Sequence, residues 1–206
     1  CKEHGIALTG HVMEEPTLKS QTSSLGEAMR NYRGFGIPGI DMLCANFEYT
    51  TAKQTQSAVH QYGREGMLSE LYGVTGWDFD FRGHMLHGDW QAALGVTVRV
   101  PHLTWMTMKG EAKRDYPASI GYQSPWWDQF ADLNAWVDGL NALMKEGERD
   151  VRVLVIPPVR GAMSEYRGGQ KTSNRVRSYS NEYRLLLENL IDVQVDFELG
   201  DERLLA

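Results

Sequence analysis

Short apolar runs alternate with helix-like segments along the first half of the chain. The runs with the length and apolar content of buried strands are 6–13, 38–43, 66–70 and 96–100. Between them, apolar positions recur with a helical period at 24–33, 52–62 and 84–94. Strands joined by helical crossovers run parallel, so this alternation predicts an α/β fold with a parallel sheet.

A polar residue marks the end of each expected strand at a regular interval. His11, Asp41, Glu70 and His102 follow one another at steps of roughly 30 residues, which is the length of one unit of a (β/α)8 barrel. The units present would make half of such a barrel. The competing architecture is an open doubly wound sheet. It usually carries a glycine-rich phosphate loop after its first strand, and this sequence has none there.

The pattern changes after Pro101. Residues 101–125 have the composition of a long loop, and 126–146 that of an amphipathic helix. The apolar stripe of this helix is expected to face the core and comprises Phe130, Leu133, Trp136, Val137, Leu140, Leu143 and Met144.

A second, shorter series of elements follows this helix. It contains an expected strand at 151–156, a glycine-rich polar stretch, a helix at 175–190 and a strand at 193–197. Two parallel strands and one helix cannot cover both faces of a sheet, so this series looks unfinished. We therefore expect two domains, the half-barrel at 1–148 and an incomplete α/β unit at 149–206.

Composition narrows the possible partners. The 206 residues carry a formal net charge of −6, which does not suit a nucleic-acid-binding surface. With 42% hydrophobic residues, the chain can bury a core, so disorder is excluded. No apolar run approaches the roughly 18–20 residues that cross a bilayer. Cys1 and Cys44 alone make no disulfide framework. Nucleic acid and membrane are not expected partners, and no compartment is indicated.

Both ends of the sequence have the character of internal positions. Cys1 opens the chain without an initiator Met or a signal-peptide pattern, and 201–206 stop within what reads as the start of another helix. We therefore expect the remainder of a longer chain to be a partner of these residues.

Ionisable residues stand at the end of every strand of the expected sheet. In barrel enzymes the reacting groups lie at the C-terminal ends of the strands. Each such residue alone could be a solvated loop residue. Burying a charge is costly unless it is paired, so a set on one rim favours a functional site. The set comprises His11, Asp41, Glu70 and His102.

Aromatic residues flank the same rim. Trp77 and Trp105 lie in loops just beyond strands, where core packing is a weaker explanation than it is for a helix. Aromatic faces stack on the C–H groups of a sugar, while carboxylates accept hydrogen bonds from its hydroxyls. A carbohydrate is therefore the expected substrate. The candidate substrate-binding residues are His11, Glu14, Glu15, Asp41, Tyr72, Trp77, His102, Trp105 and Arg114.

Several stretches resemble one enzyme family. At 69–73 a glutamate ends a short strand and is followed by an aromatic residue and Gly, which resembles the nucleophile strand of retaining glycoside hydrolases with (β/α)8 barrels. Stretches 10–15, 38–43, 88–95 and 113–117 are similar to large multidomain bacterial glycoside hydrolases of the β-galactosidase-like and α-L-rhamnosidase-like group. The resemblance covers roughly residues 5–160. It implies the C-terminal half of a (β/α)8 barrel, followed by a glutamine amidotransferase-like α/β domain.

The resemblance also implies roles for residues. Glu70 would be the catalytic nucleophile, or the base if the enzyme inverts. Glycosidases generally need a second carboxylic acid. It would lie upstream of Cys1, leaving the chain inactive alone, with Glu14 or Glu15 as the alternative. No cofactor is implied, and calcium is left open for a rhamnosidase-like enzyme. The residues implied to hold sugar hydroxyls or orient Glu70 are His11, Asp41 and His102.

Two other functions remain open at this point. A non-catalytic carbohydrate-binding barrel would use Trp77 and Trp105 for stacking and Glu70 only for hydrogen bonding. Binding without turnover would favour it. If the protein is a metal-dependent hydrolase, a strong chelator should inhibit it. Its ligands would be His11, Asp41, Glu70 and His102.

Overall fold

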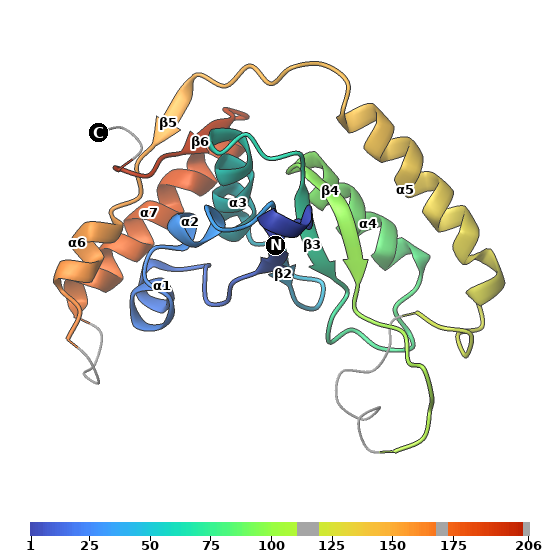
Figure 1. Ribbon diagram of the computed structural model, residues 1–206. Helices are drawn as coiled ribbons and strands as arrows, with labels where there is room; N and C mark the ends of the chain where they lie inside the picture. Colours follow the sequence, from blue (N-terminus) through green and yellow to red (C-terminus); the bar gives the residue numbers. More distant parts are fainter. Residues whose placement is uncertain (111–119, 168–172, 204–206) are drawn as a thin grey trace.

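The larger of the two sheets in the described part of the chain is parallel throughout (Figure 1). The structure is a computed structural model and describes residues 1–110, 120–167 and 173–203. The larger sheet contains β1 (Thr9–His11), β2 (Ile37–Met42), β3 (Met67–Leu71) and β4 (Val96–Pro101). The order in the sheet is the order in the sequence. The predicted α/β class with parallel strands is therefore confirmed. β1 and β4 lie at the two edges, so the origin of the sheet as half of a barrel stays a prediction.

Four helices connect these strands. They are α1 (Leu18–Ser24), α2 (Ala28–Tyr32), α3 (Tyr49–Gln61) and α4 (Phe81–Ala93). A short 3-10 turn at Lys2–His4 precedes β1. One or two helices follow each of β1, β2 and β3, as the alternating pattern predicts. Such helical crossovers connect parallel strands.

The first connection differs from the single helix expected at 24–33. Thr17 starts α1 earlier, because its side-chain oxygen accepts a hydrogen bond from the backbone N–H of Ser20 at 3.0 Å. Gly26 then adopts a φ of +82°. This left-handed conformation ends a helix and suits glycine, so α1 and α2 are separate.

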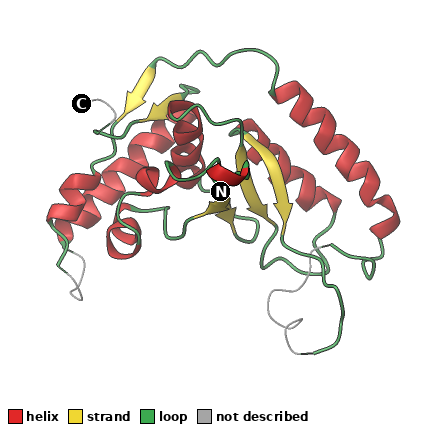
Figure 2. Ribbon diagram, viewed as in Figure 1, coloured by secondary structure: helices red, strands yellow, loops and turns green. Residues whose placement is uncertain are grey.

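The C-terminal part adds one helix, α5 (Phe130–Met144), beside α4 and then forms a second α/β layer (Figure 1). This layer contains β5 (Val153–Val155), α6 (Val159–Ser164), α7 (Asn174–Asp192) and β6 (Phe197–Leu199), and a 3-10 turn at Trp127–Gln129 leads into α5. β5 and β6 pair in parallel. Figure 1 shows α4 and α5 on one flank of the molecule and α6 and α7 on the other. In Figure 2 a long loop runs from α5 to β5 between these flanks.

The last strand lies later than predicted. The alternation of Val193, Val195 and Phe197 indicated a strand at 193–197, but α7 continues to Asp192 and Val193 caps it. Gln194 adopts a left-handed φ of +58°, which turns the chain before β6 begins at Phe197. Val193 and Val195 are exposed, so this part of the prediction is wrong.

Helix α3 lies between the two layers. It packs against β2 and β3 on one side and against β6 and α7 on the other. Its side chains are therefore buried from Thr50 to Val59, although many of them are polar. Lys53 is paired: its Nζ donates to Gln56 Oε1 at 2.6 Å and to Asp196 Oδ1 at 2.8 Å. These bonds offset the cost of burying a charge between the layers.

One apolar core joins the two parts of the chain. Leu18 and Met29, from α1 and α2, belong to the same cluster as the buried residues of the C-terminal layer, including Tyr183, Leu187 and Phe197. Helices α1 and α2 of the first part therefore cover apolar surface of the second layer that its own elements leave uncovered. The division into domains at 148 and 149 stays a prediction.

Helix α5 is less buried than its pattern predicts. Within the described residues, Leu133 is its one buried side chain, while Trp136 is 49% exposed and Leu143 and Met144 are exposed. The expectation that Trp136 is a core residue is wrong, because α5 packs mainly on α4. The indole N–H of Trp136 donates to Asp89 Oδ1 at 3.0 Å.

None of the helices in the described part of the chain is both long and apolar enough to cross a membrane.

Candidate functional site

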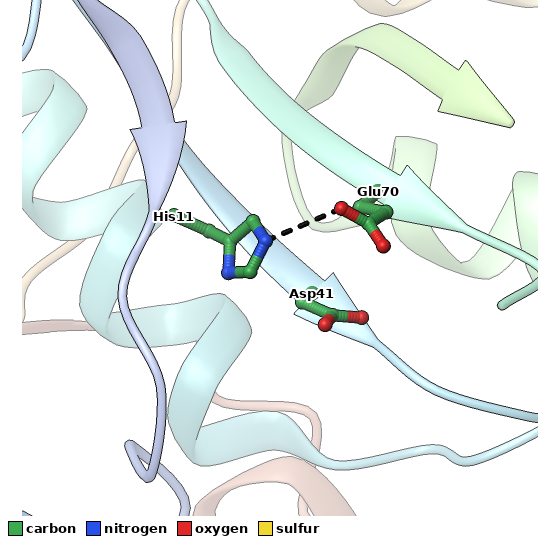
Figure 3. Close-up of side chains that lie close together, drawn as sticks. All are labelled: His11, Asp41 and Glu70. Carbon is green, nitrogen blue, oxygen red and sulfur yellow. Dashed lines mark hydrogen bonds and ion pairs between the residues drawn. The ribbon is translucent and has the colours of Figure 1, made fainter. Parts of the chain in front are cut away.

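Three ionisable side chains meet at the C-terminal ends of neighbouring strands. His11 ends β1, Asp41 is the next-to-last residue of β2, and Glu70 holds the same position in β3. Asp41 and Glu70 are directly paired in the parallel register. Figure 3 shows the three side chains converging on one face of the sheet. Their potential ligand atoms all lie within 4.8 Å of one another.

Two imidazoles flank the carboxylate of Glu70. His11 Nε2 lies 3.2 Å from Glu70 Oε2, and His102 Nε2 lies 3.8 Å from Glu70 Oε1. The other ring nitrogen of His11, Nδ1, lies 2.8 Å from the carbonyl oxygen of Val12. A carbonyl and a carboxylate both accept hydrogen bonds, so this geometry fits a His11 ring that donates from both nitrogens. The structure thus brings together the four strand-end residues predicted from their spacing.

The electrostatics favour a positive charge on His11. Burial acts to lower its pKa, but the hydrogen bond to the Val12 carbonyl and the charges of Asp41 and Glu70 outweigh burial, so the pKa is raised. Burial and the charge of Glu70 raise the pKa of Asp41, with partial compensation from the two histidines. His11 therefore lies between two acidic side chains that favour its protonated form.

Glu15 lines a pocket beside this group. The side chain is only 4% exposed, and its Oε1 has no hydrogen-bond partner among the described residues. The Nε2 atoms of Gln21 and Gln54 donate to its backbone carbonyl at 2.6 and 3.2 Å, which fixes the loop after β1. Burial raises the pKa of the Glu15 carboxyl to about 7. Near neutral pH the protonated form of this group is therefore well populated and can donate a proton.

The pocket has a volume of about 280 Å³. It lies between the loop after β1 and the segment from β2 to α3. Its polar lining includes Glu14, Glu15, Asp41, Asn46, Glu48 and Thr51.

Glu15 should make the stability of the fold depend on pH. An acid whose pKa rises on folding stabilises the fold fully below its unfolded pKa, here 4.5, and this contribution is lost as the pH rises through about 7. The loss amounts to at most about 3 kcal/mol. Glu15→Gln, which stays neutral, should match the wild type at pH 4.5 and exceed it in unfolding free energy at pH 8.5. Urea denaturation at both pH values measures this.

The neighbouring Glu14→Gln serves as the control for that experiment. Glu14 is exposed, so its substitution should leave the pH dependence unchanged. Equal pH dependence in the wild type and Glu15→Gln would show that Glu15 ionises normally.

The remaining predicted residues lie in different places. Glu14 is exposed at the pocket rim, with a φ of +67°. Tyr72 is only 3% exposed and packs toward α4, where its hydroxyl donates to the carbonyl of His84 at 3.1 Å. The structure does not bring Tyr72 to the His11–Glu70 group. Trp77 and Trp105 are half-buried, and Arg114 lies outside the described residues.

Sequence reasoning missed Glu48. Its carboxylate accepts hydrogen bonds from the backbone N–H groups of Thr50 and Thr51, at 2.5 and 2.8 Å, and so caps α3. An acidic residue just before a helix is typical of an N-cap and was the signal available. Its place on the pocket follows from the loop between β2 and α3 and could not be read from the sequence.

Two chemistries fit the group of three side chains. One imidazole nitrogen and two carboxylates can hold a divalent cation, and the mixed set suits a first-row metal better than calcium, which takes oxygen ligands. Asp41 Oδ1 is buried and has no hydrogen-bond partner in the described part of the chain, so it is available to a ligand. The same atoms equally suit acid–base work on a hydroxylated substrate.

Comparisons with known proteins give a structural likeness. No protein-family model matches the sequence, and no curated protein sequence matches it. Among solved structures, a rhamnosidase from Novosphingobium sp. PP1Y is similar, with a TM-score of 0.55 and 18% sequence identity. The alignment covers 75% of this chain and 16% of that chain. At this identity the likeness concerns the fold, and the chain spans about a sixth of the length of that structure.

Proposed function

We propose that these residues belong to a glycoside hydrolase in which Glu70 is the nucleophile or the base. The observation that carries the proposal is the Glu70 carboxylate at a strand end, flanked by His11 at 3.2 Å and His102 at 3.8 Å, with Asp41 beside it. His11 Nε2 is within hydrogen-bond distance of one oxygen and His102 lies near the other, which orients the carboxylate as a nucleophile or base requires. The structurally similar rhamnosidase is itself a glycoside hydrolase and gives distant support.

The proposal assigns Glu15 as the acid partner. Glycoside hydrolysis needs one carboxyl group that is protonated and one that is ionised. Glu15 has a pKa raised to about 7, while Glu70 sits between two imidazoles. Glu15 and Asp41 line the same pocket, and Asp41 is paired with Glu70 in the register of β2 and β3.

Substrates with different leaving groups test this assignment. In the intact protein, Glu15→Gln should lose activity on alkyl glycosides, whose leaving group needs a proton. It should retain most of its activity on dinitrophenyl glycosides, whose leaving group does not. Equal activity of the variant on both substrates would place the acid elsewhere, for example upstream of Cys1.

A metal-dependent hydrolase is the second candidate, because His11, Asp41 and Glu70 could ligate a cation. The experiment is hydrolysis of a nitrophenyl glycoside panel with and without EDTA, followed by re-addition of zinc, manganese or calcium. Acid–base glycosidase chemistry at Glu70 predicts turnover that EDTA leaves unchanged. Loss of turnover with EDTA and recovery with one metal would favour the second candidate. Sugar binding without any turnover would instead indicate a non-catalytic module.

A further inference from the structure

A second pocket lies between α1 and α7, apart from the His11–Glu70 group. Its volume is about 230 Å³. Pro16, Thr17 and Lys19 form one wall, at the start of α1. The other wall is one face of α7, which presents residues at helical spacing. Those residues include Arg177, Ser180, Tyr183 and Arg184.

Positive charge gathers at this pocket in a chain whose net charge is −6. Lys19, Arg177 and Arg184 all line it. Arg184 is neutralised in part, because its Nη1 contacts both carboxylate oxygens of Glu188 at 2.5 and 2.6 Å. Lys19 and Arg177 make no ion pair with a carboxylate within the described residues. Two cationic side chains are therefore available to an anion.

Two residues that line the same pocket, Ser180 and Tyr183, carry buried hydroxyl groups. Tyr183 is only 5% exposed, and its hydroxyl has no hydrogen-bond partner in the described part of the chain. The hydroxyl oxygen of Ser180 is likewise buried and unpartnered there. A buried polar group without a partner costs stability. An oxyanion would satisfy these donors and the two free cations together.

The pocket adjoins the one that contains Glu15. Pro16 lines both of them. Burial raises the pKa of the Tyr183 hydroxyl, and the charge of Glu48, which lines the first pocket, adds to this rise. Glu48 in turn is held by the N-terminal N–H groups of α3. A ligand that occupied both pockets would contact Pro16.

We infer that this pocket, lined by Lys19, Arg177 and Tyr183, is a subsite for the carboxylate of an acidic sugar residue in the substrate. The inference rests on the proposed function, which supplies the sugar chain. A planar carboxylate accepts two parallel hydrogen bonds from a guanidinium, which suits Arg177. Free phosphate or sulfate shares the oxyanion chemistry, so the experiment separates these sources.

The test is calorimetric titration of the intact protein carrying Glu70→Gln, so that no substrate is consumed. The probes are a galacturonic acid disaccharide, the neutral galactose disaccharide, and inorganic phosphate and sulfate. The acidic disaccharide should bind at least tenfold tighter than the neutral one, because a hydrogen bond to a charged group contributes about one factor of ten or more. Adding Arg177→Gln should abolish that preference.

Two further variants separate binding from folding. Tyr183→Phe removes only the hydroxyl and should also weaken the acidic disaccharide. Arg152→Gln makes the same charge change at an exposed residue paired with Asp150, and should keep the tenfold preference. Equal affinity for both disaccharides, or a preference that survives Arg177→Gln, would overturn the inference. Tighter binding of phosphate or sulfate than of the acidic disaccharide would also overturn it.

Hydrolysis assays on the wild type, together with these titrations, distinguish this inference from the proposed function. Hydrolysis of neutral glycosides by the wild type without any acidic preference would reject the subsite and keep the hydrolase. An acidic preference lost in Arg177→Gln, in a protein that hydrolyses no glycoside, would keep the subsite as a sugar-binding feature and reject the hydrolase.

Discussion

Replacing Glu70 by Gln is expected to lower kcat for glycoside hydrolysis by about 10²–10⁴-fold. The substitution keeps the shape of the side chain but removes the negative charge that His11 and His102 face. Neither nucleophilic attack nor activation of water is then possible at this position. Steady-state kinetics with nitrophenyl glycosides on the intact protein measure the loss, and KM should change far less than kcat.

The control for this substitution is Glu65→Gln. Glu65 is exposed and lies just before β3, at the opposite end of the strand from the candidate site. Its substitution should leave kcat within a factor of two or so, as expected for surface changes away from a site. Full activity of Glu70→Gln would contradict the proposed function. Analysis of the product anomer by NMR tells retention from inversion, and so tells whether Glu70 is nucleophile or base.

Phe197→Ala is expected to lower the free energy of unfolding by about 3–5 kcal/mol. Phe197 is 1% exposed and belongs to the core that contains Leu18 and Met29. The Nζ of Lys53 also lies 4.7 Å from the centre of its ring, so the substitution removes a cation–π contact as well. Urea denaturation followed by circular dichroism measures the change.

Tryptophan fluorescence shows whether the two parts of the chain unfold together. All 6 tryptophans lie between residues 77 and 136, far along the chain from Phe197. A shared core predicts that Phe197→Ala shifts the fluorescence transition as much as the circular dichroism transition. An unchanged fluorescence midpoint would mean that 149–206 unfold as an independent domain. Leu185→Ala, at an exposed position of α7, should change stability by less than about 0.5 kcal/mol.

The sequence predicted the larger sheet well because its signals are local. A parallel strand reads as a short apolar run, and the crossover helices show a period of 3.6 residues. Where the prediction failed, contacts distant in the sequence decide the outcome. Helix α3 is polar yet buried, because the C-terminal layer covers it and Asp196 pairs with Lys53. Helix α5 has an apolar stripe yet is exposed, because it packs mainly on α4.

The candidate site was predictable in part for the same reason. Strand periodicity and parallel direction place His11, Asp41 and Glu70 at one edge, and the structure brings them within 4.8 Å. The burial of Glu15 was not predictable, because it depends on how the loop after β1 folds against α2 and α3. Tyr72 follows Glu70 by two residues, but its left-handed backbone, with a φ of +67°, carries it toward α4.

The position of α3 limits how such a protein can change by recombination. Helix α3 is a wall common to both layers, with Lys53 and Gln61 bonded to residues near β6. A segment resembling 149–206 could not be exchanged between genes as a cassette unless it also supplied an acid like Asp196 and an aromatic ring like Phe197. Without them, Lys53 and the amide side chains along α3 would be either buried without partners or exposed to water. Because α3 packs against both layers, we expect the segment that contains α3 and residues 149–206 to be inherited together.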